Sequence, residues 1–254
     1  MITSTHGDVD YESKGHGYAV RRRPDPRIAA LIHAALGDAR TVLNVGAGTG
    51  SYEPADRHVT AVEPAAAMRA QRPAAAVPAI DATAESLPFD DNAFDAAMAT
   101  VTVHQWADTA KGLAEMRRVT RGPVVVLTFD GDALDLLWLA GYVPELIAAE
   151  RRRYPPISTI AAAIGRTAQV LPVPIPIDCT DGFTEAYYAR PEMFLNPEVR
   201  AAQSAWGFVD DTAITRGIDR LRADLASGAW DDAYGSLRTR PEFTGSLRLI
   251  VGHP

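Results

Sequence analysis

The stretch Thr41-Val-Leu-Asn-Val-Gly-Ala-Gly-Thr-Gly-Ser51 decides the fold of this chain. Its first half is a short apolar run rich in β-branched residues, which predicts a buried strand. Its second half places glycine at alternate positions. Gly46, Gly48 and Gly50 lack a Cβ, so their backbone can adopt positive φ and a ligand can approach closer than any side chain would permit. A glycine loop directly after a strand predicts a nucleoside-cofactor site.

A second apolar run, Val59-Thr-Ala-Val-Glu-Pro64, ends in a carboxylate, Glu63. A glycine loop after one strand and an acid after the next form the ribose-binding signature of open α/β sheets. A carboxylate suits a vicinal diol because its two oxygens can accept from both hydroxyls. The dinucleotide pattern G-x-G-x-x-G would need glycine at position 51, where this chain has Ser51. NAD-dependent reduction is therefore the less favoured interpretation.

The observed pattern, G-x-G-x-G, resembles motif I of the class I S-adenosylmethionine (SAM)-dependent methyltransferases, and the resemblance covers roughly residues 40 to 130. It implies SAM as cofactor and S-adenosylhomocysteine (SAH) as product. It also implies that Glu63 accepts the ribose hydroxyls and that Met68 packs on the adenine, with core packing as the alternative for Met68. The glycine-loop residues that would contact SAM are Gly46, Ala47, Gly48 and Gly50.

The segment from Asp81 to Asp95 resembles the adenine-binding loop of the same family, commonly written D-A-E-x-L-P-F-x-D-x-S-F-D. Carried onto this sequence, the positions that reach the adenine are Thr83 and the backbone amide of Ala84. Thr83 stands where the family usually has aspartate, so the side-chain contact differs from the family pattern.

Residues 101–108 resemble the V-x-H-x-W-x-D run of many small-molecule methyltransferases. They follow a predicted strand, and ligands lie at the carboxyl ends of parallel strands, so we expect Thr100, Thr102 and His104 near the reacting groups. His104 is a candidate general base, with a local hydrogen-bonding role as the alternative. Asp130 ends the next strand and points to the acceptor side, unless it caps the following helix.

Alternation of strands and helices predicts an α/β fold with a doubly wound, mainly parallel, seven-stranded Rossmann-like sheet. Asp25-Pro26 begins a helix that Gly37 ends, and a final strand over 246–251 is expected to be antiparallel. The expected strands are 41–45, 59–62, 77–80, 94–100 and 123–129, and the helices between them are 65–71 and 108–119.

The whole chain, 1–254, is expected to be a single domain with two additions around the sheet. Residues 131–175 are the expected helical cap, whose Trp138 and Tyr142 would line an apolar pocket, with core packing as the alternative. Residues 1–24 are the expected lid, where Tyr18 would bond the methionine moiety of the cofactor and Tyr11 would wall the substrate pocket.

Composition restricts the partners. The net charge is −7, which disfavours a nucleic-acid substrate, since phosphate binding normally needs a basic face. The only cysteine, Cys179, excludes an internal disulfide. No signal-peptide core or run of roughly 18 apolar residues is present, so we expect a cytoplasmic protein with no membrane partner. No His/Cys cluster has metal-ligand spacing, so no metal is expected. The oligomeric state stays open.

These patterns predict an enzyme that transfers a methyl group from SAM to a small molecule, such as a secondary metabolite. The alternative is a methyltransferase-fold protein that uses bound SAM for cyclisation or only binds it, because cofactor loops alone do not show that the methyl group leaves.

Overall fold

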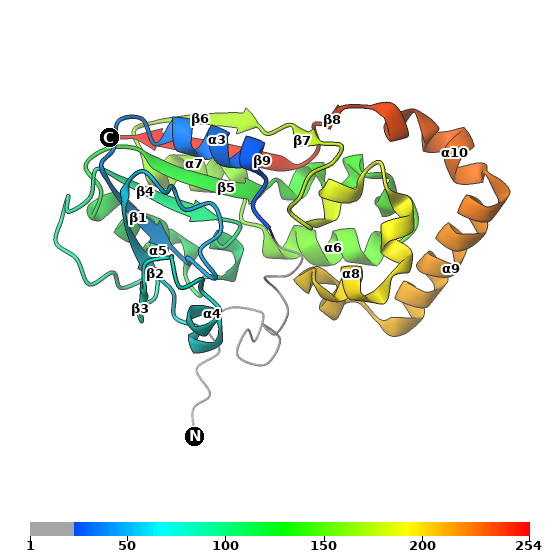
Figure 1. The fold of residues 1–254 in the computed structure, drawn as a ribbon, viewed down its shortest axis with the longest axis horizontal. Helices are drawn as coiled ribbons and strands as arrows, with labels where there is room; N and C mark the ends of the chain where they lie inside the picture. Colours follow the sequence, from blue (N-terminus) through cyan, green and yellow to red (C-terminus); the bar gives the residue numbers. More distant parts are fainter. Residues whose placement is uncertain (1–22) are drawn as a thin grey trace, which may run out of the picture.

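The computed structural model describes residues 23–254, and its centre is a seven-stranded sheet of order β3-β2-β1-β4-β5-β9-β6 (Figure 1). The first five strands in this order are parallel, and β9 runs antiparallel to both of its neighbours. The predicted mainly parallel sheet with an antiparallel final strand is confirmed. The strands are β1 (Thr41–Val45), β2 (His58–Val62), β3 (Ala79–Ile80), β4 (Ala96–Thr100), β5 (Val124–Phe129), β6 (Thr167–Pro172) and β9 (Leu247–His253).

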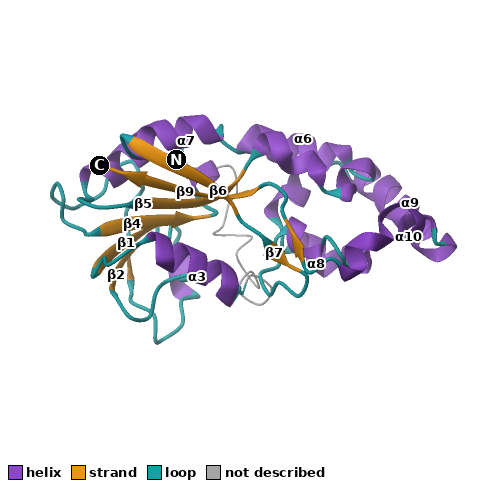
Figure 2. Ribbon diagram, turned by 90° about the horizontal axis from the view of Figure 1, so that it is seen from above, coloured by secondary structure: helices purple, strands orange, loops and turns teal. Residues whose placement is uncertain are grey.

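Helices cover both faces of the sheet, as Figure 2 shows for α3 (Pro26–Ala35) on one side and α7 (Ile157–Ile164) on the other. Helix α5 (Thr109–Arg118) packs beside α7, and the short α4 (Ala66–Ala70) follows β2. Successive strand residues point to opposite faces, so Val42 belongs to the buried cluster of α3 whereas Leu43 belongs to that of α5 and α7. Buried on both faces, the central strands are continuous apolar runs.

Beyond one end of the sheet lies a second part of the molecule, made mostly of helices (Figure 1). It comprises η2 (Gly131–Leu136), η3 (Trp138–Gly141), α6 (Pro144–Arg153), η4 (Thr184–Tyr187), η5 (Pro191–Leu195), α8 (Pro197–Ala201), η6 (Ser204–Phe208), α9 (Asp211–Ser227), α10 (Ala229–Tyr234) and η7 (Gly235–Thr239), with a small sheet of β7 (Ile175–Pro176) and β8 (Glu242–Phe243). One buried apolar cluster runs from Ile28 under the sheet to Trp230 in this helical part, so the two share a core.

The structure corrects the limits of the expected cap over 131–175. Within that span, α7 packs on α5 against the sheet, and β6 pairs with β9 as an edge strand. An edge position tolerates the proline that ends β6. Residues 184–243, which follow β6 along the chain, add the rest of the helical part. The helical part is therefore built from two chain segments, one on each side of α7 and β6.

None of the helices in residues 23–254 combines the length and the apolar character that crossing a membrane would require.

Candidate cofactor and acceptor site

The glycine loop leaves β1 with three residues in the left-handed region: φ is 68° at Gly46, 50° at Gly48 and 94° at Gly50. Such values strain any residue with a Cβ. Space is also short, because a Cβ on Gly46 would lie 2.3 Å from the hydroxyl oxygen of Thr102. Glycine at position 46 is therefore required both by its backbone conformation and by the packing of Thr102.

Glu63 follows β2 and points its carboxylate into this loop. It is buried, with one oxygen accepting from the Gly48 amide at 2.8 Å and the other from the Ala65 amide at 2.9 Å. Burial raises the pKa of Glu63, while the two amides lower it. A carboxylate offers about four acceptor sites, so capacity remains on both oxygens for hydroxyl donors.

A crevice brings together most of the predicted cofactor residues. Its lining consists of Gly46, Ala47, Gly48, Thr49, Ser51, Glu63, Met68, Thr100, Val101, Thr102 and Gln105. Sequence reasoning about the cofactor omitted Thr49, Ser51, Val101 and Gln105, although two of these lie in the 101–108 run at the carboxyl end of β4. Gly50 is absent from the lining and lies beside Glu53 and Arg72 instead.

The predicted adenine-contact residues lie outside this crevice. Ala84 is buried in the apolar cluster of α5 and α7, where it packs together with Leu87, and Thr83 is partly buried. Neither contributes to the lining. Contact between these residues and an adenine stays a prediction.

A buried ion pair contacts the glycine loop and stabilises it. Nη2 of Arg72 lies 2.8 and 2.9 Å from the two carboxylate oxygens of Glu53, and both side chains are almost fully buried. Asn44, in the middle of β1, donates to Glu53 at 3.0 Å, and Arg72 also donates to the Gly48 carbonyl at 3.3 Å. The sequence signal for this brace is the polar Asn44 inside an otherwise apolar strand, because buried polar groups need partners.

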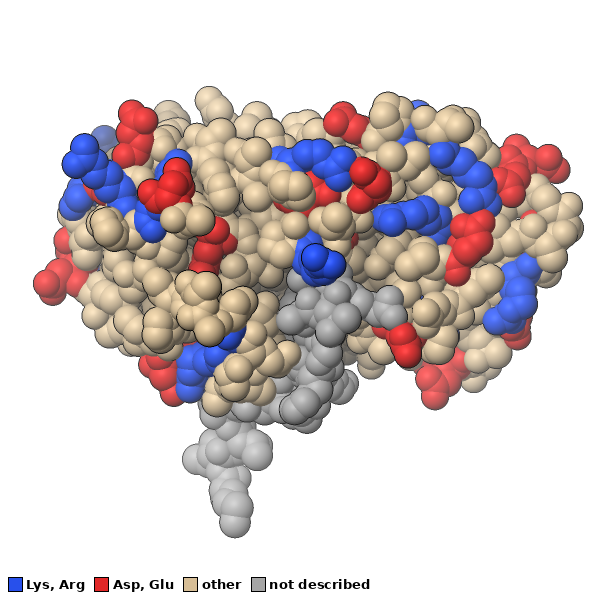
Figure 3. Space-filling view, viewed as in Figure 1, with Lys and Arg blue, Asp and Glu red and all other residues tan. Residues whose placement is uncertain are grey.

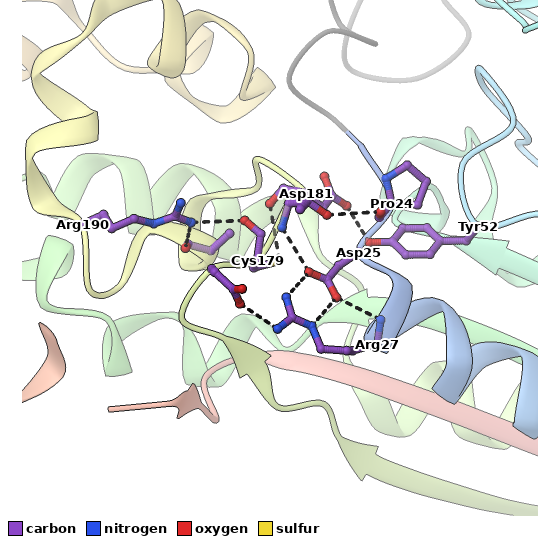
Figure 4. Close-up of polar contacts among 10 residues, drawn as sticks. Pro24, Asp25, Arg27, Tyr52, Cys179, Asp181 and Arg190 are labelled. Carbon is purple, nitrogen blue, oxygen red and sulfur yellow. Dashed lines mark hydrogen bonds and ion pairs between the residues drawn. The ribbon is translucent and has the colours of Figure 1, made fainter. Parts of the chain in front are cut away.

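A second set of polar contacts joins the loop to the helical part (Figure 4). The Tyr52 hydroxyl donates to Asp181 at 2.8 Å between buried side chains. Asp25, fully buried at the start of α3, accepts from Arg27 and from the backbone amide of Thr180. Helix α3, the cofactor loop and residues 178–181 are thereby connected.

A second cavity adjoins the crevice and shares Val101 and Gln105 with it. The remaining lining residues are His104, Phe129, Leu134, Leu137, Ile147, Glu150, Tyr154, Phe183, Thr184, Glu185, Gln203 and Ser204. Val101, at the boundary, has φ of 52°, which is strained for a β-branched residue. Burial raises the pKa of Glu185 to about 7.

His104 lies in this cavity, on η1 (Val103–Gln105) directly after β4. Its ring centroid is 4.8 Å from that of Tyr154, and its Nε2 is 3.3 Å from the amide nitrogen of Gln105. The structure thus places the candidate base beside the residues that border both spaces. Its role as a base stays a prediction.

The other predicted substrate residues lie elsewhere. The Trp138 indole donates to the Tyr188 carbonyl at 2.8 Å and packs edge-on against Trp230, while the Tyr142 hydroxyl donates to Asp224 at 2.8 Å. Both belong to the core of the helical part and lie outside the lining of this cavity, so their contact with an acceptor stays a prediction.

Asp130 caps η2 by accepting from the Asp132 amide at 3.1 Å and lies 3.5 Å from Arg248, outside the cavity lining. The capping alternative describes this residue, and its expected place in the substrate pocket is corrected. Tyr11 and Tyr18 lie outside the described residues, as does nearly all of the expected lid over 1–24.

The chain matches known methyltransferases in sequence and structure. Residues 43–126 match the family described as a methyltransferase domain. A solved structure from Anabaena variabilis, described as a methyltransferase from an antibiotic biosynthesis pathway, is 30% identical with a TM-score of 0.83, over 91% of this chain and 98% of that chain. An uncharacterized methyltransferase of Mycobacterium tuberculosis is 37% identical over 123 residues, and this match spans only 45% of either protein.

The [4+2]-cyclase SpnF is also similar in structure, with a TM-score of 0.50 and 17% identity over 90% of this chain and 81% of that chain. A likeness at this identity shows the fold alone. The Anabaena protein differs, because its match extends over nearly its whole length at higher identity. The chain therefore belongs to the class I SAM-dependent methyltransferases, within the methyltransferase-domain family that its residues 43–126 match.

Proposed function

We propose that this protein transfers a methyl group from SAM to a small-molecule acceptor. The observation that carries the proposal is the pair of adjoining spaces at the carboxyl end of β4, which share Val101 and Gln105. One has the glycine loop and the buried carboxylate that suit a nucleoside. The other has apolar walls that suit an organic acceptor.

The residues present fit SAM. The backbone of Gly46 and Gly48 lines the crevice, and Glu63 in the same lining offers free acceptor sites for the ribose hydroxyls. SAM, when bound, supplies a methyl group already activated by a sulfonium. The protein's own contribution is then to hold the acceptor in line and exclude water, which can lower a barrier by roughly 7 to 11 kcal/mol in favourable cases.

His104 would accept a proton from the acceptor if that acceptor needs to lose one. Its place beside Gln105 at the boundary of the two spaces supports this role. A His104→Ala variant should then show reduced turnover that recovers as the pH is raised, because the acceptor ionises without help. Full turnover of the variant at neutral pH would dismiss the base.

Two observations support a small molecule as the acceptor. The Anabaena protein is described as a methyltransferase from an antibiotic biosynthesis pathway, and antibiotics are small molecules. On the face drawn in Figure 3, positive and negative side chains of the described residues are interspersed, without the continuous basic surface that nucleic-acid binding requires.

Calorimetry with SAM, SAH and NAD tests the cofactor assignment. We expect SAM and SAH to bind and NAD not to bind; the reverse would refute the proposal. Glu63→Ala should weaken SAM binding by about 1–3 kcal/mol, because ribose hydroxyls then lose their acceptor in a buried site. Unchanged affinity would remove Glu63 from the site.

Product analysis separates methyl transfer from cyclisation or simple binding. SAM carrying a labelled methyl group is incubated with the enzyme and a panel of small amines, alcohols and phenols, and both SAH and labelled product are measured. We expect the two to form in equal amounts. If SAM binds but no compound in the panel leads to the formation of SAH, the result would favour cyclisation or simple binding.

A further inference from the structure

Two buried polar side chains of the acceptor cavity have unused hydrogen-bonding atoms. The first is Glu185, which is 3% exposed. Its Oε1 accepts from the Ser246 amide at 2.8 Å, and its Oε2 has no hydrogen-bond partner among the described residues. A buried carboxyl oxygen without a donor is costly, so a ligand that donates a hydrogen bond there would remove the cost.

The second side chain is Gln203, which is 5% exposed. Its Oε1 accepts from the Thr184 hydroxyl at 2.8 Å and from the Trp206 indole N–H at 3.1 Å. The indole can only donate, so these contacts fix which end of the amide is oxygen. The Nε2 end is left without a partner in the described structure and offers its hydrogens to an oxygen acceptor.

The charged groups around the cavity favour a cation. Glu150 and Glu185 both line it, whereas no lysine or arginine within residues 23–254 does. Two cations lie outside this lining: Arg153 donates to Ser204, and Arg248 lies against Asp130 and acts electrostatically on Glu185. With two carboxyl groups and no cationic side chain in the described lining, the cavity favours a positively charged ligand over an anion.

Aromatic side chains supply the rest of the wall. The ring of Phe129 lies 5.5 Å from those of both Tyr154 and Phe183, measured between centroids. Aromatic faces pack against apolar ligands and also attract ammonium groups. The wall therefore suits an apolar body that carries a positively charged end.

We propose that the acceptor site takes an apolar amine with a neighbouring hydroxyl or carbonyl oxygen, the nitrogen donating to Glu185 and the oxygen accepting from Gln203. This inference rests on the proposed function, because it names the substrate class of the same site. It excludes carboxylic acids and phosphate esters as acceptors.

Three probes of the same size test the proposal: phenylalaninol, 3-phenylpropan-1-ol and 3-phenylpropionate. Their binding is measured by ligand-observed NMR and calorimetry, with and without saturating SAH. We expect the amino alcohol to bind at least tenfold more tightly than the alcohol, and the carboxylate to bind more weakly than both. Binding of the carboxylate as tightly as the amino alcohol would overturn the proposal, and so would failure of all three to bind.

Variants assign the two contacts. Glu185→Gln should reduce the preference for the amino alcohol over the alcohol at least fivefold. Gln203→Leu should weaken the binding of the amino alcohol and of the alcohol by a similar factor. Glu242→Gln removes an exposed carboxylate on β8 and should change neither. An unchanged preference in Glu185→Gln would contradict the proposal. If that variant fails to fold, the preference of the unaltered protein and the Gln203→Leu result still decide it.

SAH binding distinguishes the two levels of inference. Loss of SAM and SAH binding by the unaltered protein would refute the proposed function. Normal SAH binding with a preference for the carboxylate would refute only the acceptor class. The measurements without SAH keep the probe comparison valid in either case.

Discussion

At Glu185 a single carboxyl group links stability to pH. Burial raises its pKa from the ordinary 4.5 to about 7, while Ser246 and Arg248 oppose that rise. Glu150 and His104 line the same cavity. The folded protein binds this proton more tightly than the unfolded chain does. The resulting stabilisation is complete below pH 4.5 and is lost as the pH rises to about 7.

Glu185→Gln should remove this pH dependence, because the amide keeps an oxygen for the Ser246 amide and does not titrate. Relative to the variant, the unaltered protein should lose roughly 3 kcal/mol of unfolding free energy between pH 4 and pH 8. Urea unfolding at the two pH values measures the difference. Parallel behaviour of the two proteins would contradict a raised pKa.

The sequence predicts residues of this site when their role depends on local pattern. Gly46 and Glu63 directly follow β1 and β2, and His104 stands four residues after the end of β4. Gln203 and Glu185 could not be identified in this way, since only tertiary packing buries them and leaves an atom unused. Trp138 shows a related ambiguity, because an aromatic side chain suits a core and a pocket equally well.

At the scale of elements, the contact between Tyr52 and Asp181 joins the cofactor loop to the helical part. Tyr52→Phe should destabilise the protein by about 1–3 kcal/mol, since a buried carboxylate loses a donor. It should also weaken SAM binding, because the loop is less firmly held. The backbone at position 52 has φ of 65°, but this strain is the same for both residues and cancels.

Thermal unfolding and calorimetry with SAM measure these two effects of Tyr52→Phe. Tyr234→Phe is a matched control, as Tyr234 packs against Trp138 and Trp230 through its ring. Equal stability of the two variants would show that the contact does not hold the loop.

Elements with a complete signal of their own were predicted closely. Helix α3 spans Pro26–Ala35, as the Asp25-Pro26 start and the Gly37 stop indicate, and Gly37 adopts φ of 58°. The expected limits of the cap, 131–175, differ from those of the helical part for another reason. An apolar helix face can pack on a sheet or on another helix. Ile160 and Ile164 of α7 suit either environment, so the sequence does not distinguish them.

At the scale of the whole molecule, the shared core predicts that the sheet and the helical part unfold together. Three of the four tryptophans, Trp138, Trp206 and Trp230, lie in the helical part, far along the chain from the cofactor crevice. SAH at about 100 times its Kd should stabilise the protein by about 2.7 kcal/mol and raise Tm by roughly 5–10 °C.

That increase should appear equally in tryptophan fluorescence and in far-ultraviolet circular dichroism. A fluorescence transition that SAH leaves unmoved would show that the helical part unfolds independently.

The strained backbone at Val101 lies where the acceptor has to approach the methyl donor. Among the described residues, this valine and Gln105 are the ones that line both spaces, so they stand at the junction between them. A φ of 52° costs a β-branched residue on the order of 1–3 kcal/mol, which the surrounding packing must supply. Because in-line transfer needs the reacting atoms within about 3–3.5 Å of each other, the size of the side chain at position 101 affects how closely an acceptor can approach the methyl group.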